Sequence, residues 1–111
     1  MRRSGAASDP ALRLLGLAAR AGGVVPGTER VREAARGGHL HLALVAVDAS
    51  ANAQDKLLPL LEARRVPHLI VFTRAELGGA VGRGPLSAVG LTEASLAKRV
   101  RELIGGSGVE E

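Results

Sequence analysis

The sequence contains no cysteine, tryptophan or tyrosine, and its one aromatic residue is Phe72. Without cysteine there are no disulfide scaffolds, thiolate zinc sites, iron–sulfur centres or cysteine nucleophiles. The shortage of aromatic rings excludes RNA-recognition-motif sheets, cold-shock domains and single-strand-binding barrels, because these modules stack bases on aromatic side chains. If a protein of this composition binds nucleic acid, it does so with arginine side chains and backbone amides.

Long hydrophobic runs are also missing. No apolar stretch approaches the ~20 residues that span a bilayer, and no secretory-signal core follows Arg2 and Arg3. We therefore expect a cytoplasmic protein with no membrane partner. The 111 residues suit one domain rather than two. With 46% hydrophobic residues, the chain can bury a core.

Positive charge is concentrated in the first part of the chain. Residues 1–41 contain seven arginines and three acidic residues, whereas residues 42–111 contain eight basic and eight acidic residues. Because arginine pairs bidentately with phosphate, this asymmetry indicates a polyanionic partner. A solvated arginine-rich face without a ligand would produce the same balance.

Helical and extended patterns alternate along the chain. Asp9, Thr28 and Thr92 are predicted helix caps, and Thr73 with Glu76 is a predicted capping box. Asp48 is predicted to cap the turn after a strand, and Pro59 is predicted to begin a helix after an interrupting turn. The predicted helices cover residues 10–21, 29–36, 59–65 and 92–104, and a further short helix begins at residue 73 and ends either at residues 78–79 or at residue 82. The predicted strands cover residues 24–25, 40–47, 68–72 and 86–91.

The segment from Leu42 to Val47 is apolar on both faces, which is typical of a central strand covered on both sides. Together with the alternation of elements, it predicts an α/β fold with helices on both faces of the sheet. We expect one domain over residues 10–104, a flexible N-terminal tail over residues 1–9 and a polar C-terminal tail over residues 105–111.

Several short motifs resemble enzyme or metal sites but are incomplete. Gly22 and Gly27-Thr28 have P-loop spacing, but the essential lysine is missing. His39 and His41 lack a third ligand of suitable type nearby, and Ser50 has no histidine beside it. We therefore predict no catalytic residue, no metal site and no cofactor. The free amides between Gly27 and Arg30 remain able to hold a phosphate oxygen.

Several stretches, in order from about residue 11 to residue 104, resemble the ribosomal protein family that binds kink-turn RNA. This family includes archaeal seven-Ae, eukaryotic thirty-e and small bacterial relatives. The matching stretches are Leu15-Gly16-Leu17-Ala18-x-Arg20-Ala21-Gly22, Val25-x-Gly27-Thr28-x-x-Val31, Asp48 after the apolar strand, Leu58-Pro59-Leu60 with Val66-Pro67, and Thr73-Arg74-x-Glu76-Leu77-Gly78-x-Ala80-x-Gly82.

The resemblance implies a three-layer α-β-α sandwich around a small mixed four-stranded sheet, and a non-enzymatic protein that docks into kinked RNA. The family reads RNA with an Asn-Glu-x-x-Lys element at the start of the second helix, and those three positions fall on Glu29, Arg30 and Glu33. The bacterial relatives match better here, since they commonly carry Gly-Glu-x-x-Val and an arginine at the position of Arg36. The loop that covers a flipped nucleotide falls on residues 82–86, with Arg83 as a phosphate partner.

This resemblance predicts a ribosome-associated or structured-RNA-binding protein. Ribosomal RNA is the first candidate ligand, and ribosomal, translation or transcription proteins are candidate partners. An alternative is a protein-interaction module that has lost the RNA face and uses the apolar loop around Pro85 and Leu86. Four arginines are expected to outline the phosphate-facing surface: Arg20, Arg30, Arg74 and Arg83. The full set of predicted RNA-binding residues is Arg20, Gly27, Thr28, Glu29, Arg30, Glu33, Arg36, Arg74 and Arg83.

Overall fold

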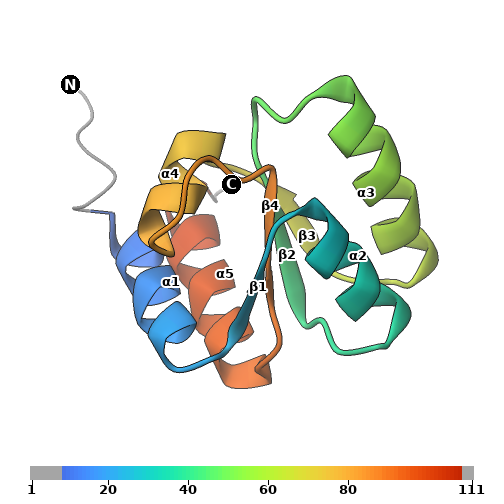
Figure 1. The fold of residues 1–111 in the computed structure, drawn as a ribbon. Helices are drawn as coiled ribbons and strands as arrows, with labels where there is room; N and C mark the ends of the chain where they lie inside the picture. Colours follow the sequence, from blue (N-terminus) through green and yellow to red (C-terminus); the bar gives the residue numbers. More distant parts are fainter. Residues whose placement is uncertain (1–8, 109–111) are drawn as a thin grey trace.

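The computed structural model describes residues 9–108 (Figure 1). The predicted N-terminal tail, apart from Asp9, lies outside this range. In chain order the elements are α1 (Pro10–Arg20), β1 (Val24–Pro26), α2 (Thr28–Arg36), β2 (Leu42–Val45), α3 (Ala51–Ala63), β3 (His68–Ile70), α4 (Arg74–Ala80), β4 (Ala88–Leu91) and α5 (Ala94–Gly108).

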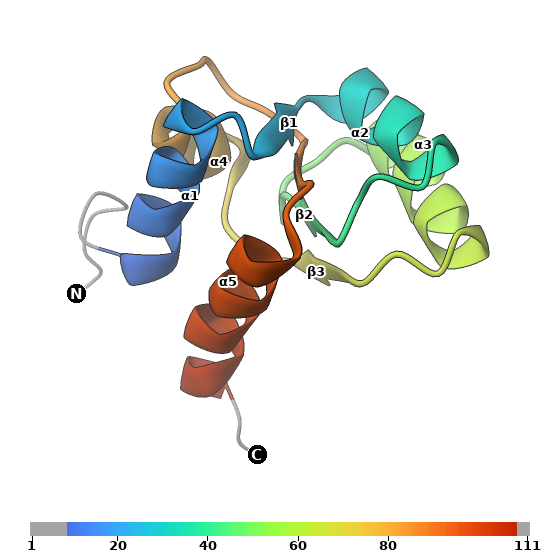
Figure 2. The ribbon, with the colours of Figure 1, turned by 90° about the horizontal axis from the view of Figure 1, so that it is seen from below.

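The strands form one mixed sheet in the order β1-β4-β2-β3. β4 pairs antiparallel with both β1 and β2, whereas β2 and β3 are parallel. Helices α1, α4 and α5 cover one face of the sheet, and α2 and α3 cover the other (Figures 1 and 2). The predicted three-layer α-β-α sandwich around a mixed four-stranded sheet is confirmed.

The central position of β2 is also confirmed. The strand lies between β4 and β3, and all four of its residues are buried. The apolar side chains on both faces of this strand explain the placement, because only a strand with helices on both sides buries both sets. The ladder ends at Val45, and Val47, which was expected inside the strand, is 54% exposed.

The helix starts predicted at Asp9 and Thr73 are confirmed, whereas the start predicted at Thr28 is not. The Asp9 carboxylate accepts hydrogen bonds from the amides of Ala11 and Leu12, and Thr73 forms a capping box with Glu76. Thr28 is wrong as a cap, because α2 begins at Thr28 itself and Gly27 is the N-cap. Gly27 has φ +99°, a conformation that favours glycine, and this sharp change of direction leads the chain from β1 into α2.

The predicted break at Pro59 is wrong. Helix α3 is continuous from Ala51 to Ala63, with Pro59 inside it. An interior proline removes one backbone hydrogen bond, but Pro59 is exposed, and Leu57 and Leu61 on either side of it are fully buried. Core packing of these two leucines therefore holds the helix through the proline.

The predicted caps Asp48 and Thr92 have other partners. The amide of Ala53 donates to the Ser50 hydroxyl, so Ser50 caps α3, while Asp48 contacts α4. The Thr92 hydroxyl donates to the Gly23 carbonyl, and α5 begins two residues later, at Ala94. Helix α5 continues to Gly108, past the end predicted for it. Within residues 9–108, no helix has the length and apolar character needed to cross a membrane.

Candidate nucleic-acid interface

Segments that are far apart in the sequence meet at one end of the sheet. The Gly27 amide, at the start of α2, donates to the Ala88 carbonyl at the start of β4 (2.8 Å). The Ala46 amide, just after β2, donates to the Ser87 carbonyl (2.9 Å). The start of α2 and the end of β2 therefore flank the start of β4.

The loop between α4 and β4 lies against α4 in the same region. The Leu86 amide donates to the Arg74 carbonyl (3.1 Å), and the Arg83 amide donates to the Gly78 carbonyl (2.8 Å). A Cβ atom at Gly78 would overlap the Gly84 carbonyl, so only glycine allows this close approach. We call the surface formed by Gly27–Arg30, Asp48, Arg74 and residues 82–86 the strand-end surface.

The first turn of α2 offers unfilled amide donors at this surface. Its N-cap is a glycine and provides no side-chain hydrogen bond, and the Gly27 amide is already bound to β4. The amides of Thr28, Glu29 and Arg30, which come next, have no intrahelical acceptor, because the helix starts at Thr28. Both Glu29 and Arg30 are exposed here, and Arg30 forms no ion pair with any described residue. This turn can accept an anionic oxygen.

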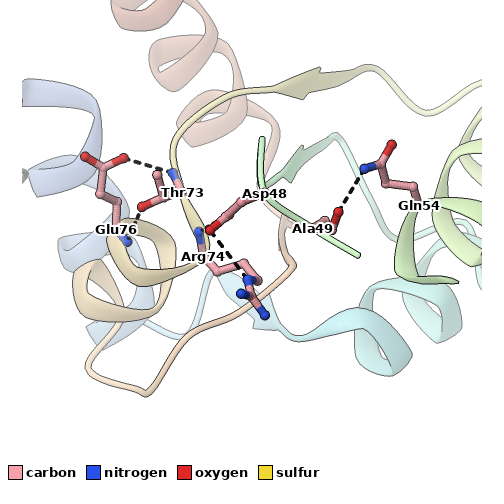
Figure 3. A network of polar contacts seen from close by, with 6 residues as sticks. All are labelled: Asp48, Ala49, Gln54, Thr73, Arg74 and Glu76. Atoms are coloured by element: carbon pink, nitrogen blue, oxygen red, sulfur yellow. Dashed lines mark hydrogen bonds and ion pairs between the residues drawn. The ribbon is translucent and has the colours of Figure 1, made fainter. Parts of the chain in front are cut away.

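Asp48 and Arg74 join the end of β2 to the start of α4 (Figure 3). The Arg74 amide donates to Asp48 Oδ1 (2.8 Å), and the Arg74 Nε atom lies 3.6 Å from Asp48 Oδ2. The amide hydrogen bond, with a smaller contribution from the guanidinium charge, lowers the pKa of Asp48. The contact orients the Arg74 side chain, which is 48% exposed, at the strand-end surface.

Glu29 points toward α3. Its Oε1 atom lies 2.9 Å from Arg32 Nη1, and its Oε2 atom lies 3.7 Å from Lys56 Nζ. Two cations therefore compensate the carboxylate. By contrast, the ion pairs among the described residues do not include Glu33, so neither Arg30 nor Arg36, which lie three residues to either side of it, compensates its charge at contact distance.

The predicted RNA-binding residues do not all lie together. The structure brings six of them to the strand-end surface: Gly27, Thr28, Glu29, Arg30, Arg74 and Arg83. Glu33 lies one helical turn further along α2. Arg36 ends α2, about 12 Å from Thr28 along the helix axis, and its carbonyl accepts a hydrogen bond from Arg64 Nη1.

Arg20 lies outside the strand-end surface. It ends α1, before β1, whereas Gly27 follows β1. Its side chain borders a groove of about 590 Å³ between α1 and α4. Arg20 was expected to outline one phosphate-facing surface with Arg30, Arg74 and Arg83, but β1 lies between Arg20 and the start of α2.

Two sets of ion pairs at this surface were not predicted from the sequence. Arg32 and Lys56 were not predicted to pair with Glu29, and Asp48 was not predicted to contact Arg74. The spacing of Glu29 and Arg32, three residues apart on one helix, was a usable signal. The contact between Asp48 and Arg74 has no such signal, since it depends on β2 and β3 lying parallel side by side.

The fold and site define a small α-β-α protein whose exposed polar groups gather where the loops of a mixed sheet meet. The chain belongs to the ribosomal protein L7Ae/L30e/S12e/Gadd45 family, whose profile matches residues 10–100. It is 33% identical to the RNA-binding protein YlxQ of Enterococcus faecium over 96 residues, which cover 86% of this chain and 92% of that protein. It is 34% identical to the RNA-binding protein YlxQ of Bacillus subtilis (strain 168) over 91 residues, covering 82% and 91% of the two chains.

Solved structures agree with this assignment. A Bacillus halodurans protein of unknown function superposes with a TM-score of 0.82 at 32% identity, over 87% of this chain and 98% of that one. The Giardia lamblia 15.5kD RNA binding protein superposes with a TM-score of 0.72 at 20% identity, over 96% and 90% of the two chains. The second likeness is one of fold.

Proposed function

We propose that this protein binds structured RNA through the strand-end surface and catalyses no reaction. The observation that carries the proposal is the convergence of the unfilled amides of α2 with Arg30, Arg74 and Arg83 at one end of the sheet. The two YlxQ relatives are named as RNA-binding proteins and align over most of the chain, which supports the same conclusion. Ribosomal RNA in the cytoplasm is the first candidate ligand.

Binding rests on the RNA backbone. Arginine and amide donors contact phosphate oxygens, and such contacts position a protein on RNA with strong salt dependence. Stacking contributes little, since Phe72, the one aromatic residue, is half-buried against the core. We therefore expect affinity that follows the shape and phosphate geometry of the RNA more than its bases.

Kink-turn preference is weak in this protein. The three positions that resemble the family's Asn-Glu-x-x-Lys element carry Glu29, Arg30 and Glu33. The Glu29 carboxylate pairs with Arg32 and Lys56. Glu33 adds a carboxylate that forms no ion pair with a described residue, next to the first turn of α2. Each lost base contact reduces discrimination by about 1–3 kcal/mol.

The polar residues that most resemble catalytic groups have structural roles. Ser50 accepts a hydrogen bond from the amide of Ala53, and Asp48 is bound to the start of α4. Neither side chain has a histidine partner among the described hydrogen bonds. These contacts support a binding protein rather than an enzyme.

Filter binding tests the proposal with three labelled RNAs: a kink-turn, a duplex without G·A pairs and a ribosomal RNA fragment. Wild-type protein should bind all three at low salt, and the double variant Arg74→Ala/Arg83→Ala should lose affinity for each, with a salt slope smaller by about two. The matched control is Arg99→Ala/Arg101→Ala on α5, whose exposed arginines lie away from the strand-end surface. If no RNA is retained, the alternative of a protein-interaction module replaces this proposal.

A further inference from the structure

A groove between α1 and α4 lies on the face of the sheet opposite α2 and α3. It has a volume of about 590 Å³, and Gly16, Leu17 and Gly79 are among the residues that line it. The two helices approach closely at Gly16, where a Cβ atom would lie 2.7 Å from the Ala80 carbonyl oxygen. Beside this contact, the missing side chain of Gly79 leaves open space. Small residues therefore create a depression with an apolar floor.

Leu17 borders this groove with its side chain in solvent. It is 59% exposed, the largest exposure among the large hydrophobic residues described as exposed. An exposed leucine beside an apolar depression offers area that a partner can remove from water. RNA would gain little from covering Leu17, because phosphates and sugars are polar and do not form apolar contacts with the leucine side chain.

The charges around the groove are uncompensated. Arg13 and Arg20 are seven residues apart on α1, which places them on the same side of the helix and about 10.5 Å apart along its axis. Both are exposed, and neither side chain forms an ion pair with a described residue. Glu76, the acidic residue that lines the groove, accepts a hydrogen bond from the Thr73 amide with Oε1 (2.9 Å) and keeps its charge, so the groove has one carboxylate against two guanidinium groups.

We propose that this groove binds an acidic amphipathic helix of a partner protein. Apolar side chains on one face of that helix would enter the groove beside Leu17, and two carboxylates about seven residues apart would pair with Arg13 and Arg20. The charge pattern disfavours the chain's own first residues as occupant, since residues 1–8 contain two arginines and no acidic residue. It also disfavours a symmetric contact with a second copy, which would bring the same arginines together.

Fluorescence anisotropy tests the proposal with designed, labelled peptides of about five helical turns. The acidic probes carry glutamates seven residues apart and Leu, Ile, Met or Phe between them on the same face. One control peptide distributes the same residues around the helix, and a second replaces the glutamates with lysines. The full-length wild-type protein should bind at least one acidic probe in the micromolar range and neither control.

Gly79→Leu is the blocking variant. Leucine has a better helix propensity than glycine, and the position faces open space, so the variant should fold while its side chain fills the groove. We expect affinity for the acidic probe to fall by about tenfold or more, with RNA retention unchanged. Gly105→Leu, at another helical glycine with open space around it, is the matched control.

Arg13→Glu/Arg20→Glu tests the charge pairing. It should weaken binding of the acidic probe and create binding of the lysine probe, a reversal that misfolding cannot produce. Lys98→Glu/Arg99→Glu on α5 has the same charge change and should affect neither probe. The proposal is overturned if no acidic probe exceeds the controls, or if charge reversal gives no exchange of partners. Loss of RNA retention equal to that of Arg74→Ala/Arg83→Ala would instead make the groove an RNA surface.

Discussion

The strand-end surface and the α1–α4 groove both carry exposed arginines, yet their surroundings differ. At the strand-end surface, Arg30, Arg74 and Arg83 lie among backbone amides and loop carbonyls, and Asp48 orients Arg74. In the groove, Arg13 and Arg20 stand beside Leu17 and an apolar depression. An arginine among polar donors suits phosphate, whereas an arginine beside exposed apolar area suits an amphipathic protein segment. Net charge alone does not separate these two cases.

Adjacent glycines of α4 offer the largest test of this contrast. Gly78 supports the strand-end surface, and Gly78→Ala would force its Cβ against the Gly84 carbonyl, which we expect to destabilise the fold by about 1–3 kcal/mol. Gly79→Ala faces open space and should stabilise it by up to ~1 kcal/mol through helix propensity. Urea denaturation of both variants measures the difference. Equal stabilities would mean that the loop over residues 82–86 does not pack on Gly78.

RNA binding should separate the same pair further. Because the loop carrying Arg83 must move in Gly78→Ala, that variant should lose affinity for structured RNA even at temperatures where it is fully folded. Gly79→Ala should bind RNA like the wild type. A filter-binding titration at constant salt checks this expectation.

Exchanging three residues of α2 should increase the preference of the strand-end surface for kink-turn RNA. The triple change Glu29→Asn, Arg30→Glu and Glu33→Lys places the family's element at the matching positions, so base contacts worth about 1–3 kcal/mol each become available. We expect kink-turn affinity to rise above affinity for a duplex lacking the G·A pairs. Isothermal calorimetry measures the affinity of the variant and of the wild type for both RNAs. Tight binding of the kink-turn by the unaltered protein would show that Glu29 and Glu33 do not oppose RNA binding.

Removing one of the proposed phosphate contacts should have a smaller and uniform effect on RNA affinity. Arg83→Ala should weaken binding by a similar factor for every structured RNA and reduce the salt slope by about one. Arg20→Ala should leave the slope unchanged, because Arg20 borders the groove instead. Filter binding across a salt series compares the salt slopes of the two variants. A larger effect of Arg20→Ala than of Arg83→Ala would place RNA binding at the groove rather than at the strand-end surface.

The smallest expected effect is the pH dependence from Asp48. Its pKa is lowered in the folded state, so its charged form contributes stability that is present above the unfolded-state value of about 3.9 and is lost as pH falls through the folded-state value. Asp48→Asn should therefore be slightly less stable than the wild type at pH 7, and the difference should shrink in acid. Urea midpoints at neutral and acidic pH measure this, and a constant difference would contradict the assignment.

The sequence by itself determined those local structures that depend on residues close together in the chain. Asp9 with Pro10 starts α1, Thr73 with Glu76 starts α4, and the two-sided apolar pattern of β2 makes it a central strand. Capping joins groups two or three residues apart, and strand burial follows the alternation of side chains, so both can be read along the chain.

Tertiary structure decided which of the polar residues lie together. The contact of Asp48 with Arg74 requires β2 and β3 to run parallel, and β1 places Arg20 apart from Gly27. Likewise, packing of Leu57 and Leu61 keeps α3 intact through Pro59. These outcomes depend on sheet order and core packing, which are set by the sum of many long-range contacts. For that reason the sequence could identify a basic protein of the L7Ae/L30e family, while only the fold could divide its arginines between two surfaces.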